Sequence, residues 1–338
     1  MNKMKAIEVK APGADFELVY REVPNPSKNQ IRIKVEACGV CHGESIIKEG
    51  GFLAKDSFYP RIPGHEVVGI VDKLGEDVLG FEVGTRVGVG WFGGYCLECK
   101  ACKNGDFKNC ENKLVTGLSI DGGYAEYMIA NVESIAKIPD ELSALDAAPL
   151  LCAGRTTFGA LTESKGKPGD TVVIQGIGGL GHLGIQFAKK LGFKVIALSR
   201  GDDKKDLSLK LGASIYIDSR KEDATKKIQE LGGAKVILIT APNSKAASDL
   251  IPALSYNGEM VIVSGSNEPM SINPGMLLGS SASIKGWASG DLDKTLNFSV
   301  VTKVLPMIEV FPLEEASKAY KKMMDSKVKF RCVLDMSL

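Results

Sequence analysis

Four cysteines lie close together in the sequence with the spacing of metal ligands. Cys96, Cys99, Cys102 and Cys110 read C-x2-C-x2-C-x7-C within GYCLECKACKNGDFKNC. Two-residue spacings let thiolates converge on one tetrahedral ion, and four sulfurs complete the shell of a structural zinc, with no position left for water. Reduced thiols and a four-cysteine iron–sulfur cluster are the alternatives, but the spacing fits zinc better than it fits a ferredoxin. We therefore predict a structural zinc here.

A second group of metal-ligating residue types is scattered along the chain. Cys41 stands in CGVCHGE, His65 in PGHEVVG and Cys152 in APLLCAG. A catalytic zinc needs three protein ligands and one open position, which three such residues could provide. Spacing alone is a weak argument, because a lone cysteine is usually a small buried hydrophobe and a lone histidine a satisfied polar group. Only the fold can bring these residues together.

A glycine-rich turn between a strand and a helix predicts a dinucleotide site. The apolar run TVVIQ (171–175) is followed by a G-x-G-x-x-G turn, and apolar residues then recur at helical spacing. In such a turn the glycines allow the tight bend, the approach of the pyrophosphate and close helix–strand packing, while the helix N-terminus faces the phosphates. The cofactor-binding residues predicted here are Gly176, Gly178, Gly179, Leu180 and Gly181.

Strand and helix patterns alternate beyond this turn. Strands are expected at 194–199, 214–218, 235–240 and 259–265, with helices at 202–212, 224–232 and 245–254. This alternation predicts a Rossmann-type, doubly wound parallel sheet in an α/β protein. We also expect Val263 and Ser264, at the end of the last of these strands, to line the cofactor site. The alternative is a βαβ fold that binds something other than NAD(P).

The choice of cofactor depends on the end of the second strand of this domain. NAD-binding sites favour an acidic residue there, which holds the ribose 2′-hydroxyl. Here the positions are Ser199 and Arg200, so we predict that NADP(H) is preferred over NAD(H), because a guanidinium accommodates a 2′-phosphate. The alternative is that Arg200 points to solvent and Asp202 or Asp203 holds the ribose.

The rest of the chain has a different pattern. Residues 1–148 show short alternating strands with glycine turns, typical of a barrel-like domain, and after about residue 282 the βα alternation stops. A helix in EEASKAYKKMMDS and a closing strand in FRCVLDM follow. We predict a catalytic domain formed by 1–148 and 285–338, with a nucleotide-binding domain at 149–284 inserted between its parts and the active site in the cleft between the two domains.

Composition excludes several classes of function. Lys+Arg at 42 against Asp+Glu at 41 leaves a net charge of +1, so no whole-chain basic excess points to nucleic acid or an anionic membrane. Neither a secretory signal nor an apolar run long enough to span a bilayer is found. Eight cysteines in such a chain are better explained as ligands or thiols than as disulfides, and we predict a cytoplasmic location.

At this point the sequence resembles the zinc-dependent alcohol dehydrogenases of the medium-chain dehydrogenase/reductase superfamily. Gly64-His65-Glu66 with Gly69, Gly75 and Gly84, the four-cysteine lobe (91–112), APLLCAG and GIGGLG occur in this order over nearly the whole chain. The resemblance implies a GroES-like, mostly β catalytic domain around the Rossmann domain. It also implies two zinc ions per chain, a small alcohol or aldehyde substrate, and a homodimer or homotetramer.

The resemblance assigns roles residue by residue. Cys41, His65 and Cys152 match the catalytic-zinc ligands, and Glu66 matches a glutamate that can approach the metal during ligand exchange. His42 matches a position that reaches the cofactor phosphate or the proton relay. The remaining matches are Thr156 near the nicotinamide, Arg331 at the pyrophosphate and Trp91 in the substrate pocket.

One departure from the family pattern affects proton transfer. Members usually follow Cys-His with Ser or Thr and then Asp, whereas Gly43 and Glu44 occupy these places here. Gly43 has no hydroxyl to take the proton from an alcohol, and Ile46 replaces a frequent relay histidine. The relay then runs through water or His42, or aldehyde reduction is favoured. We expect Glu44 to accept a hydrogen bond from the second ring nitrogen of His65.

Three other functions are compatible with parts of this pattern. A zinc-free quinone reductase of the same superfamily would normally lack both cysteine sets. A polyol or formaldehyde dehydrogenase shares the architecture and differs mainly in its substrate pocket. A non-catalytic NADPH-binding protein is the third, and Gly43 is its best support.

Overall fold

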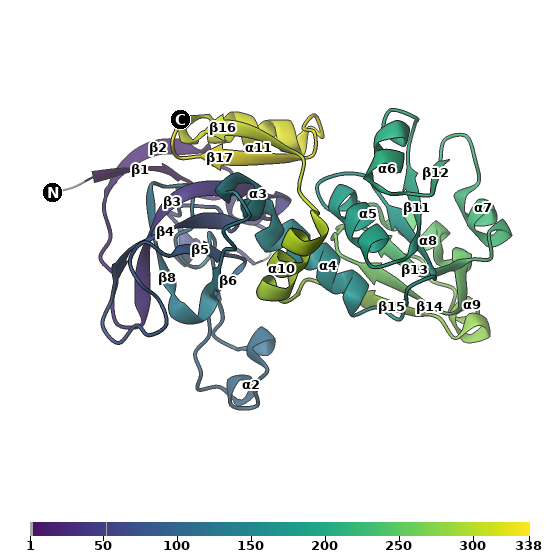
Figure 1. Cartoon of the computed structure of the whole chain (residues 1–338), viewed down its shortest axis with the longest axis horizontal. Helices are drawn as coiled ribbons and strands as arrows, with labels where there is room; N and C mark the ends of the chain where they lie inside the picture. Colours follow the sequence, from purple (N-terminus) through teal and green to yellow (C-terminus); the bar gives the residue numbers. More distant parts are fainter. Residues whose placement is uncertain (1–2, 52) are drawn as a thin grey trace. The chain divides into compact units, whose positions relative to one another are not determined.

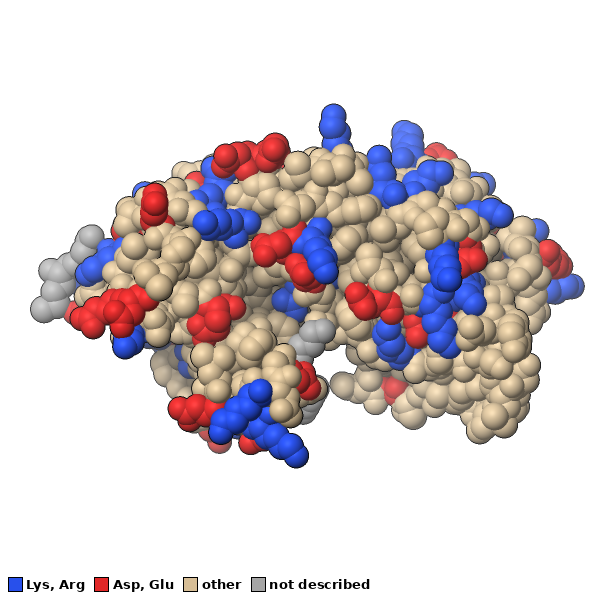
Figure 2. Space-filling model, turned by 60° about the horizontal axis from the view of Figure 1, so that its bottom comes forward, with Lys and Arg blue, Asp and Glu red and all other residues tan. Residues whose placement is uncertain are grey.

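The computed structural model describes residues 3–51 and 53–338, which form two compact units (Figure 1). The first unit combines residues 1–152 with 306–338, and the second comprises 153–305. Within the described part of the chain, no helix has the length and apolar character needed to cross a membrane. Acidic and basic side chains are interspersed over the face shown in Figure 2, as the small net charge leads one to expect.

The first unit is mostly β. Its largest sheet has the order β16-β17-β3-β4-β5-β9, with β8 also paired to β3. Alternate residues of β3 are buried, among them Ile31, Ile33 and Val35, as the period of two predicts. The strands of this sheet are β3 (Gln30–Val40), β4 (Val67–Leu74), β5 (Arg86–Val89), β8 (Tyr127–Asn131), β9 (Ile135–Lys137), β16 (Ile308–Pro312) and β17 (Arg331–Asp335). Two small ladders pair β1 (Lys3–Glu8) with β2 (Glu17–Glu22) and β6 (Phe92–Gly94) with β7 (Leu114–Val115).

Short helices and helical turns connect the strands of this unit. They are η1 (His42–Glu44), α1 (Ser45–Glu49), η2 (Asp56–Phe58), α2 (Lys100–Lys103), η3 (Phe107–Asn109), η4 (Val132–Ser134), α3 (Ala144–Pro149), η7 (Leu313–Glu315) and α11 (Ala316–Met324). After α3 the helix widens into a π turn, η5 (Leu150–Gly154). Pro149 at the end of α3 has no N–H to continue the α pattern, and π turns are frequent at functional sites.

The second unit confirms the predicted doubly wound sheet. Its six strands are all parallel, in the order β12-β11-β10-β13-β14-β15. They are β10 (Thr171–Gln175), β11 (Lys194–Ser199), β12 (Ile215–Asp218), β13 (Ala234–Ile239), β14 (Leu254–Ile262) and β15 (Ser283–Gly286). The helices are α4 (Arg155–Thr162), α5 (Gly181–Lys190), α6 (Lys205–Leu211), α7 (Ala224–Glu230), α8 (Ser244–Asp249), η6 (Ile251–Ala253), α9 (Pro274–Ser280) and α10 (Leu292–Thr302).

The chain returns to the first unit later than the sequence pattern suggests. We expected the crossing at 284/285, where the alternation of strands and helices stops, but the structure has it at 305/306. The reason is α10, which packs on α4 inside the second unit, with the rings of Phe298 and Phe158 4.8 Å apart. This contact joins residues distant in sequence, so local periodicity does not reveal it.

The glycine turn after β10 is held tightly by its surroundings. A Cβ on Gly181 would lie 1.9 Å from the Gly176 carbonyl oxygen, so only glycine fits at the start of α5. The hydroxyl of Thr240 donates to the Gly176 carbonyl over 2.8 Å. These contacts fix the bend that leads into the N-terminus of α5.

Candidate active site and metal centres

The four predicted structural ligands converge in the lobe between β6 and β7. The sulfurs of Cys96, Cys99, Cys102 and Cys110 all lie within 4.8 Å of one another. Cys99 is the N-cap of α2, so its position is set by the start of that helix. Four sulfurs at such separations surround a volume that suits one tetrahedral ion.

Backbone amides in this lobe point at the sulfurs. The amide of Cys99 donates to Cys96 Sγ over 3.4 Å, and the amide of Cys102 donates to Cys99 Sγ over 3.5 Å. Hydrogen bonds from the amides of Glu98 and Cys99 lower the pKa of the Cys96 thiol to about 6. Burial, by contrast, raises the pKa of the Cys102 thiol to about 12. The thiolate is the form that binds metal, so the amides prepare Cys96 in particular for a cation.

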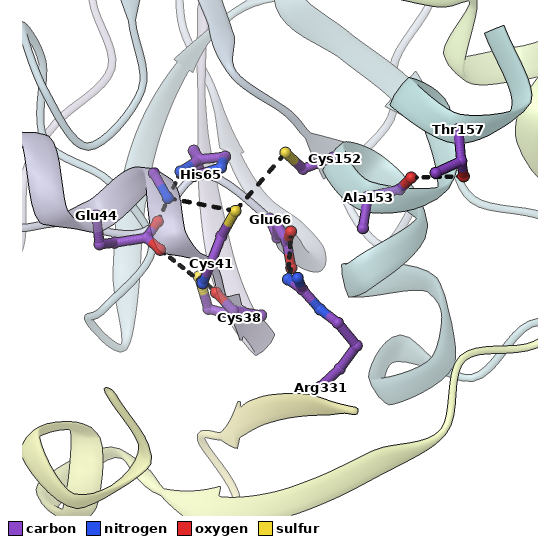
Figure 3. A network of polar contacts seen from close by, with 11 residues as sticks. Cys38, Cys41, Glu44, His65, Glu66, Cys152, Ala153, Thr157 and Arg331 are labelled. Carbon is purple, nitrogen blue, oxygen red and sulfur yellow. Dashed lines mark hydrogen bonds and ion pairs between the residues drawn. The ribbon is translucent and has the colours of Figure 1, made fainter. Parts of the chain in front are cut away.

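A second cluster brings together the residues assigned to the catalytic metal (Figure 3). One ligand atom each from Cys41, His65, Glu66 and Cys152 lies within 4.8 Å of the others, and the sulfurs of Cys41 and Cys152 are 3.9 Å apart. Cys41 follows β3, and His65 and Glu66 immediately precede β4. These strands are paired, with Cys38 opposite Val67, which places the two segments side by side. Cys152 comes from the π turn η5.

Glu44, the expected partner of His65, lies directly beside it. His65 Nδ1 lies 2.6 Å from Glu44 Oε1, and both side chains are almost fully buried. Its other ring nitrogen, Nε2, is buried and has no hydrogen-bond partner among the described residues. An imidazole held at one nitrogen and unpartnered at the other is the arrangement of a metal ligand.

Glu44 also organises the backbone at Cys41, which the sequence did not reveal. Its second carboxylate oxygen accepts a hydrogen bond from the Cys41 amide over 2.6 Å, and Cys41 Sγ accepts one from the Gly43 amide over 3.5 Å. This is a capping box around η1. One buried carboxylate therefore orients two of the three ligand-bearing segments.

The charges of the cluster favour a cation. The hydrogen bond from Cys152 lowers the pKa of Cys41 well below its usual range, and the nearby charge of His65 acts in the same direction. Against the cost of burial, the charges of Glu44 and Cys41 raise the pKa of His65 well above its usual value. Anionic groups concentrated in a buried volume thus attract positive charge, here a proton and, in its place, a metal ion.

Arg331 lies in this cluster, paired with Glu66. Its Nη2 donates to both Glu66 oxygens over 2.5 Å, and both side chains are buried. Burial raises the pKa of Glu66 to about 8, against the opposing charge of Arg331. The predicted pyrophosphate contact of Arg331 stays a prediction. No local pattern could have found the ion pair, because its partners are 265 positions apart.

Trp91 and Gly43 pack against His65. The rings of Trp91 and His65 meet edge to face with centroids 4.8 Å apart, and Trp91 also packs on the small apolar cluster of Ile47, Val115 and Leu118. A Cβ on Gly43 would lie 2.8 Å from His65 Cε1 and 3.2 Å from Trp91 Cζ3. The two rings therefore occupy the space into which a side chain at position 43 would point.

The other predicted residues lie in less crowded places. His42 is exposed on η1 and is outside the ligand cluster, Cys38 is a buried thiol, and Thr156 is half-buried on α4. Ser199 ends β11, Arg200 is exposed beyond it, and Val263 and Ser264 follow β14. Their roles toward the cofactor stay predictions.

Two residues that support the glycine turn were not predicted as cofactor-binding. His182 Nδ1 lies 3.0 Å from the Gly178 carbonyl oxygen, and the Lys204 ammonium donates to the Ile177 carbonyl over 2.9 Å. Lys204 stands five positions after Ser199, directly before α6. A cation at the start of the helix after the second strand is the signal that could have identified it.

Comparisons with known proteins agree with this architecture. Residues 27–140 match the alcohol dehydrogenase GroES-like domain, and residues 179–309 match the zinc-binding dehydrogenase family. The chain is 41% identical to alcohol dehydrogenase patD of Penicillium expansum, covering 97% of this chain and 96% of the relative. It is 38% identical to an alcohol dehydrogenase of Geobacillus stearothermophilus, covering 98% and 99%. Among solved structures, CAD from Helicobacter pylori complexed with NADP(H) gives a TM-score of 0.87 at 25% identity, covering 99% of this chain and 98% of that one.

The chain therefore belongs to the zinc-binding alcohol dehydrogenases of the medium-chain dehydrogenase/reductase superfamily. This membership makes it an oxidoreductase of the alcohol dehydrogenase type. The predicted GroES-like domain is confirmed.

The two clusters predict different consequences of losing a thiolate. Cys152→Ala should reduce zinc from two ions per chain to one and abolish hydride transfer, while the melting temperature changes little. Cys96→Ala should also leave one zinc but lower the melting temperature by ~5–10 °C, because a closed site contributes folding free energy. Elemental analysis, thermal unfolding and turnover distinguish the two variants. Full activity of Cys152→Ala would contradict the assignment.

The position of Glu44 predicts that its charge matters for metal retention. Glu44→Gln should weaken zinc binding at the Cys41–His65–Cys152 cluster by about 10–100-fold, because a partner that orients a ligand is lost. Competition with a chelator measures this, and zinc in the four-cysteine lobe should be unaffected. Glu76→Gln, the same charge change on an exposed residue, is the control. Equal retention in both variants would exclude the role of Glu44.

The packing around Gly43 predicts that the usual hydroxyl cannot simply be restored. Gly43→Ser should lower kcat/KM by on the order of 10²-fold, because its Cβ displaces His65 or Trp91. Gly279→Ser, where a Cβ meets no atom within 4 Å, is the matched control. An increase in turnover for Gly43→Ser would contradict this prediction. It would show that His65 and Trp91 can move aside and that the serine hydroxyl improves proton transfer.

Proposed function

We propose that this chain is a zinc-dependent dehydrogenase that interconverts alcohols with aldehydes or ketones by hydride transfer to and from NADP(H). The observation that carries the proposal is the convergence of Cys41, His65 and Cys152, with His65 Nε2 buried and unpartnered. These three side chains would hold one zinc with an open position, and the four-cysteine lobe would hold a second. A zinc held by the first three side chains would supply Lewis acidity toward the oxygen of the substrate.

The chain's own residues prepare the site for this chemistry. Glu44 holds the imidazole of His65 and the Cys41 backbone in position, so the ligands need no rearrangement. Trp91 presents an aromatic ring beside the ligands, and this supports a role in excluding water from the substrate. Glu66 lies within the ligand cluster and is paired with Arg331, and this position supports its role as an alternative ligand.

Proton exchange requires a group other than residue 43. Gly43 has no hydroxyl and Ile46 no titratable group, whereas His42 is exposed one residue after Cys41. We assign the exchange to His42 acting with solvent, because a group that takes a proton from the site must also release it to water.

Three cationic or polar groups near the end of β11 support NADP(H) as the preferred cofactor. Ser199 and the exposed Arg200 stand where an NAD-specific enzyme has an acidic residue, and Lys204 reaches toward the glycine turn. Of the two carboxylates that could hold a ribose, Asp202 is ion-paired with Lys221, which leaves Asp203 as the alternative. The NADP(H) complex of the Helicobacter pylori relative is in line with this choice.

A polyol dehydrogenase is the second candidate. A probable mannitol dehydrogenase of Fragaria ananassa is 33% identical to this chain over 95% of its length. The metal chemistry would be the same, and only the substrate would differ. In either case we expect a cytoplasmic homodimer or homotetramer.

A substrate and cofactor panel tests the proposal. We expect the zinc-loaded enzyme to oxidise primary or secondary alcohols, or to reduce aldehydes, with a clearly higher rate with NADP(H) than with NAD(H) at equal concentration. A preference for NADH would overturn the cofactor assignment. Turnover of mannitol above all simple alcohols would favour the second candidate. Absence of any turnover, with both zinc ions present, would favour a non-catalytic NADPH-binding protein.

A further inference from the structure

The loop after β12 lies beside the loop that carries Arg200. Strands β11 and β12 are parallel neighbours, with Ser199 opposite Asp218. The residues that follow each strand therefore emerge at the same edge of the sheet, where cofactors bind in this class of fold. The Ser219 amide donates to the Ser199 carbonyl over 2.9 Å, which joins the two loops directly.

The carboxylate of Asp218 fixes both loops. It is buried, and its Oδ1 accepts hydrogen bonds from the amides of Gly201, over 2.7 Å, and of Arg220, over 3.0 Å. On the other side of Gly201, the hydroxyl of Tyr216 donates to the carbonyl over 2.5 Å. The backbone that carries Arg200 is thus held in a fixed relation to the backbone that carries Arg220.

The guanidinium of Arg220 lies against this loop, on the side of Gly201 where the carboxylate of Asp203 also lies. Its Nη1 is 3.6 Å from the place that a Cβ on Gly201 would occupy. Within the described residues it has no ion-pair partner, whereas the neighbouring Lys221 pairs with Asp202. Two guanidinium groups and Lys204 at this edge outnumber its one carboxylate without an ion pair, Asp203, because Asp202 is paired with Lys221, and this makes the edge attractive to an anion.

We propose that Arg220, positioned by Asp218, is a second cationic ligand of the 2′-phosphate of NADP(H), acting together with Arg200. The inference rests on the proposed NADP(H) preference and extends it to a residue from the neighbouring strand. A planar guanidinium donates two parallel hydrogen bonds to a phosphate, so two arginines can neutralise its two charges. Asp218 is a positioning residue, since its carboxylate accepts hydrogen bonds from the backbone amides of Gly201 and Arg220.

Binding of cofactor fragments tests this without any dependence on zinc or turnover. Adenosine 2′,5′-bisphosphate carries the 2′-phosphate, and adenosine 5′-monophosphate lacks it. By calorimetry, Arg220→Ala should weaken the binding of the bisphosphate about tenfold, the value of one charge-assisted hydrogen bond, and leave the monophosphate unchanged. Arg220→Lys should lose less. Lys210→Ala, which removes one exposed charge at the C-terminal end of α6, is the matched control and should bind as the wild type does.

The outcomes separate this inference from the proposal on which it rests. If the wild type prefers the bisphosphate but Arg220→Ala binds it equally well, Arg220 has no such role and NADP(H) remains the cofactor. If the wild type binds the bisphosphate no more tightly than the monophosphate, the NADP(H) assignment is wrong, and the role of Arg220 is wrong as well. If Arg220→Ala binds both fragments more weakly by the same factor, the substitution has distorted the loop, and this result would also overturn the proposed role of Arg220. Asp218→Asn, with Arg220 retained, should weaken only the bisphosphate.

Discussion

The cluster of Cys41, His65 and Cys152 depends on the contacts that the buried carboxylate of Glu44 makes. A charge without water must be paired or hydrogen-bonded, and Glu44 meets this requirement through His65 Nδ1 and the Cys41 amide. These two partners come from segments that the pairing of β3 with β4 places side by side. These two contacts of Glu44 fix the direction of His65 Nε2 and the course of the backbone at Cys41. Both must be correct if the imidazole and the thiolate are to bind the same ion.

The departure at Gly43 is part of the packing at this site. The rings of His65 and Trp91 fill the space beside Gly43, and Trp91 is itself held by an apolar cluster. An aromatic wall and a hydroxyl at position 43 thus compete for the same volume. A buried carboxylate also positions backbone in the second unit. There Asp218 Oδ1 accepts hydrogen bonds from the amides of Gly201 and Arg220, which belong to two different loops. In both places a buried carboxylate accepts hydrogen bonds from the backbone and so holds neighbouring side chains in position.

The sequence predicted those features that local patterns encode. The strands 171–175 and 194–199 and the four-cysteine lobe follow from residue type and spacing, and the structure contains them. The link between Glu44 and His65 was predictable because histidine ligands need a partner at the second nitrogen. The pairing of Arg331 with Glu66 and the packing of α10 on α4 depend on contacts between distant segments, which periodicity cannot register. The family resemblance placed Arg331 at the cofactor and did not predict its ion pair with Glu66.

X-ray absorption at the zinc edge tests the central claim most directly, namely that two different sites are built from these side chains. Four sulfurs surround one volume, while two sulfurs and the nitrogen of His65 surround the other. The account predicts two zinc ions per chain and an average first shell of three sulfurs, at about 2.3 Å, and one nitrogen or oxygen, at about 2.0–2.1 Å. In Cys152→Ala the remaining zinc should show four sulfurs. A single zinc in the wild type, or an all-sulfur shell in it, would contradict the account.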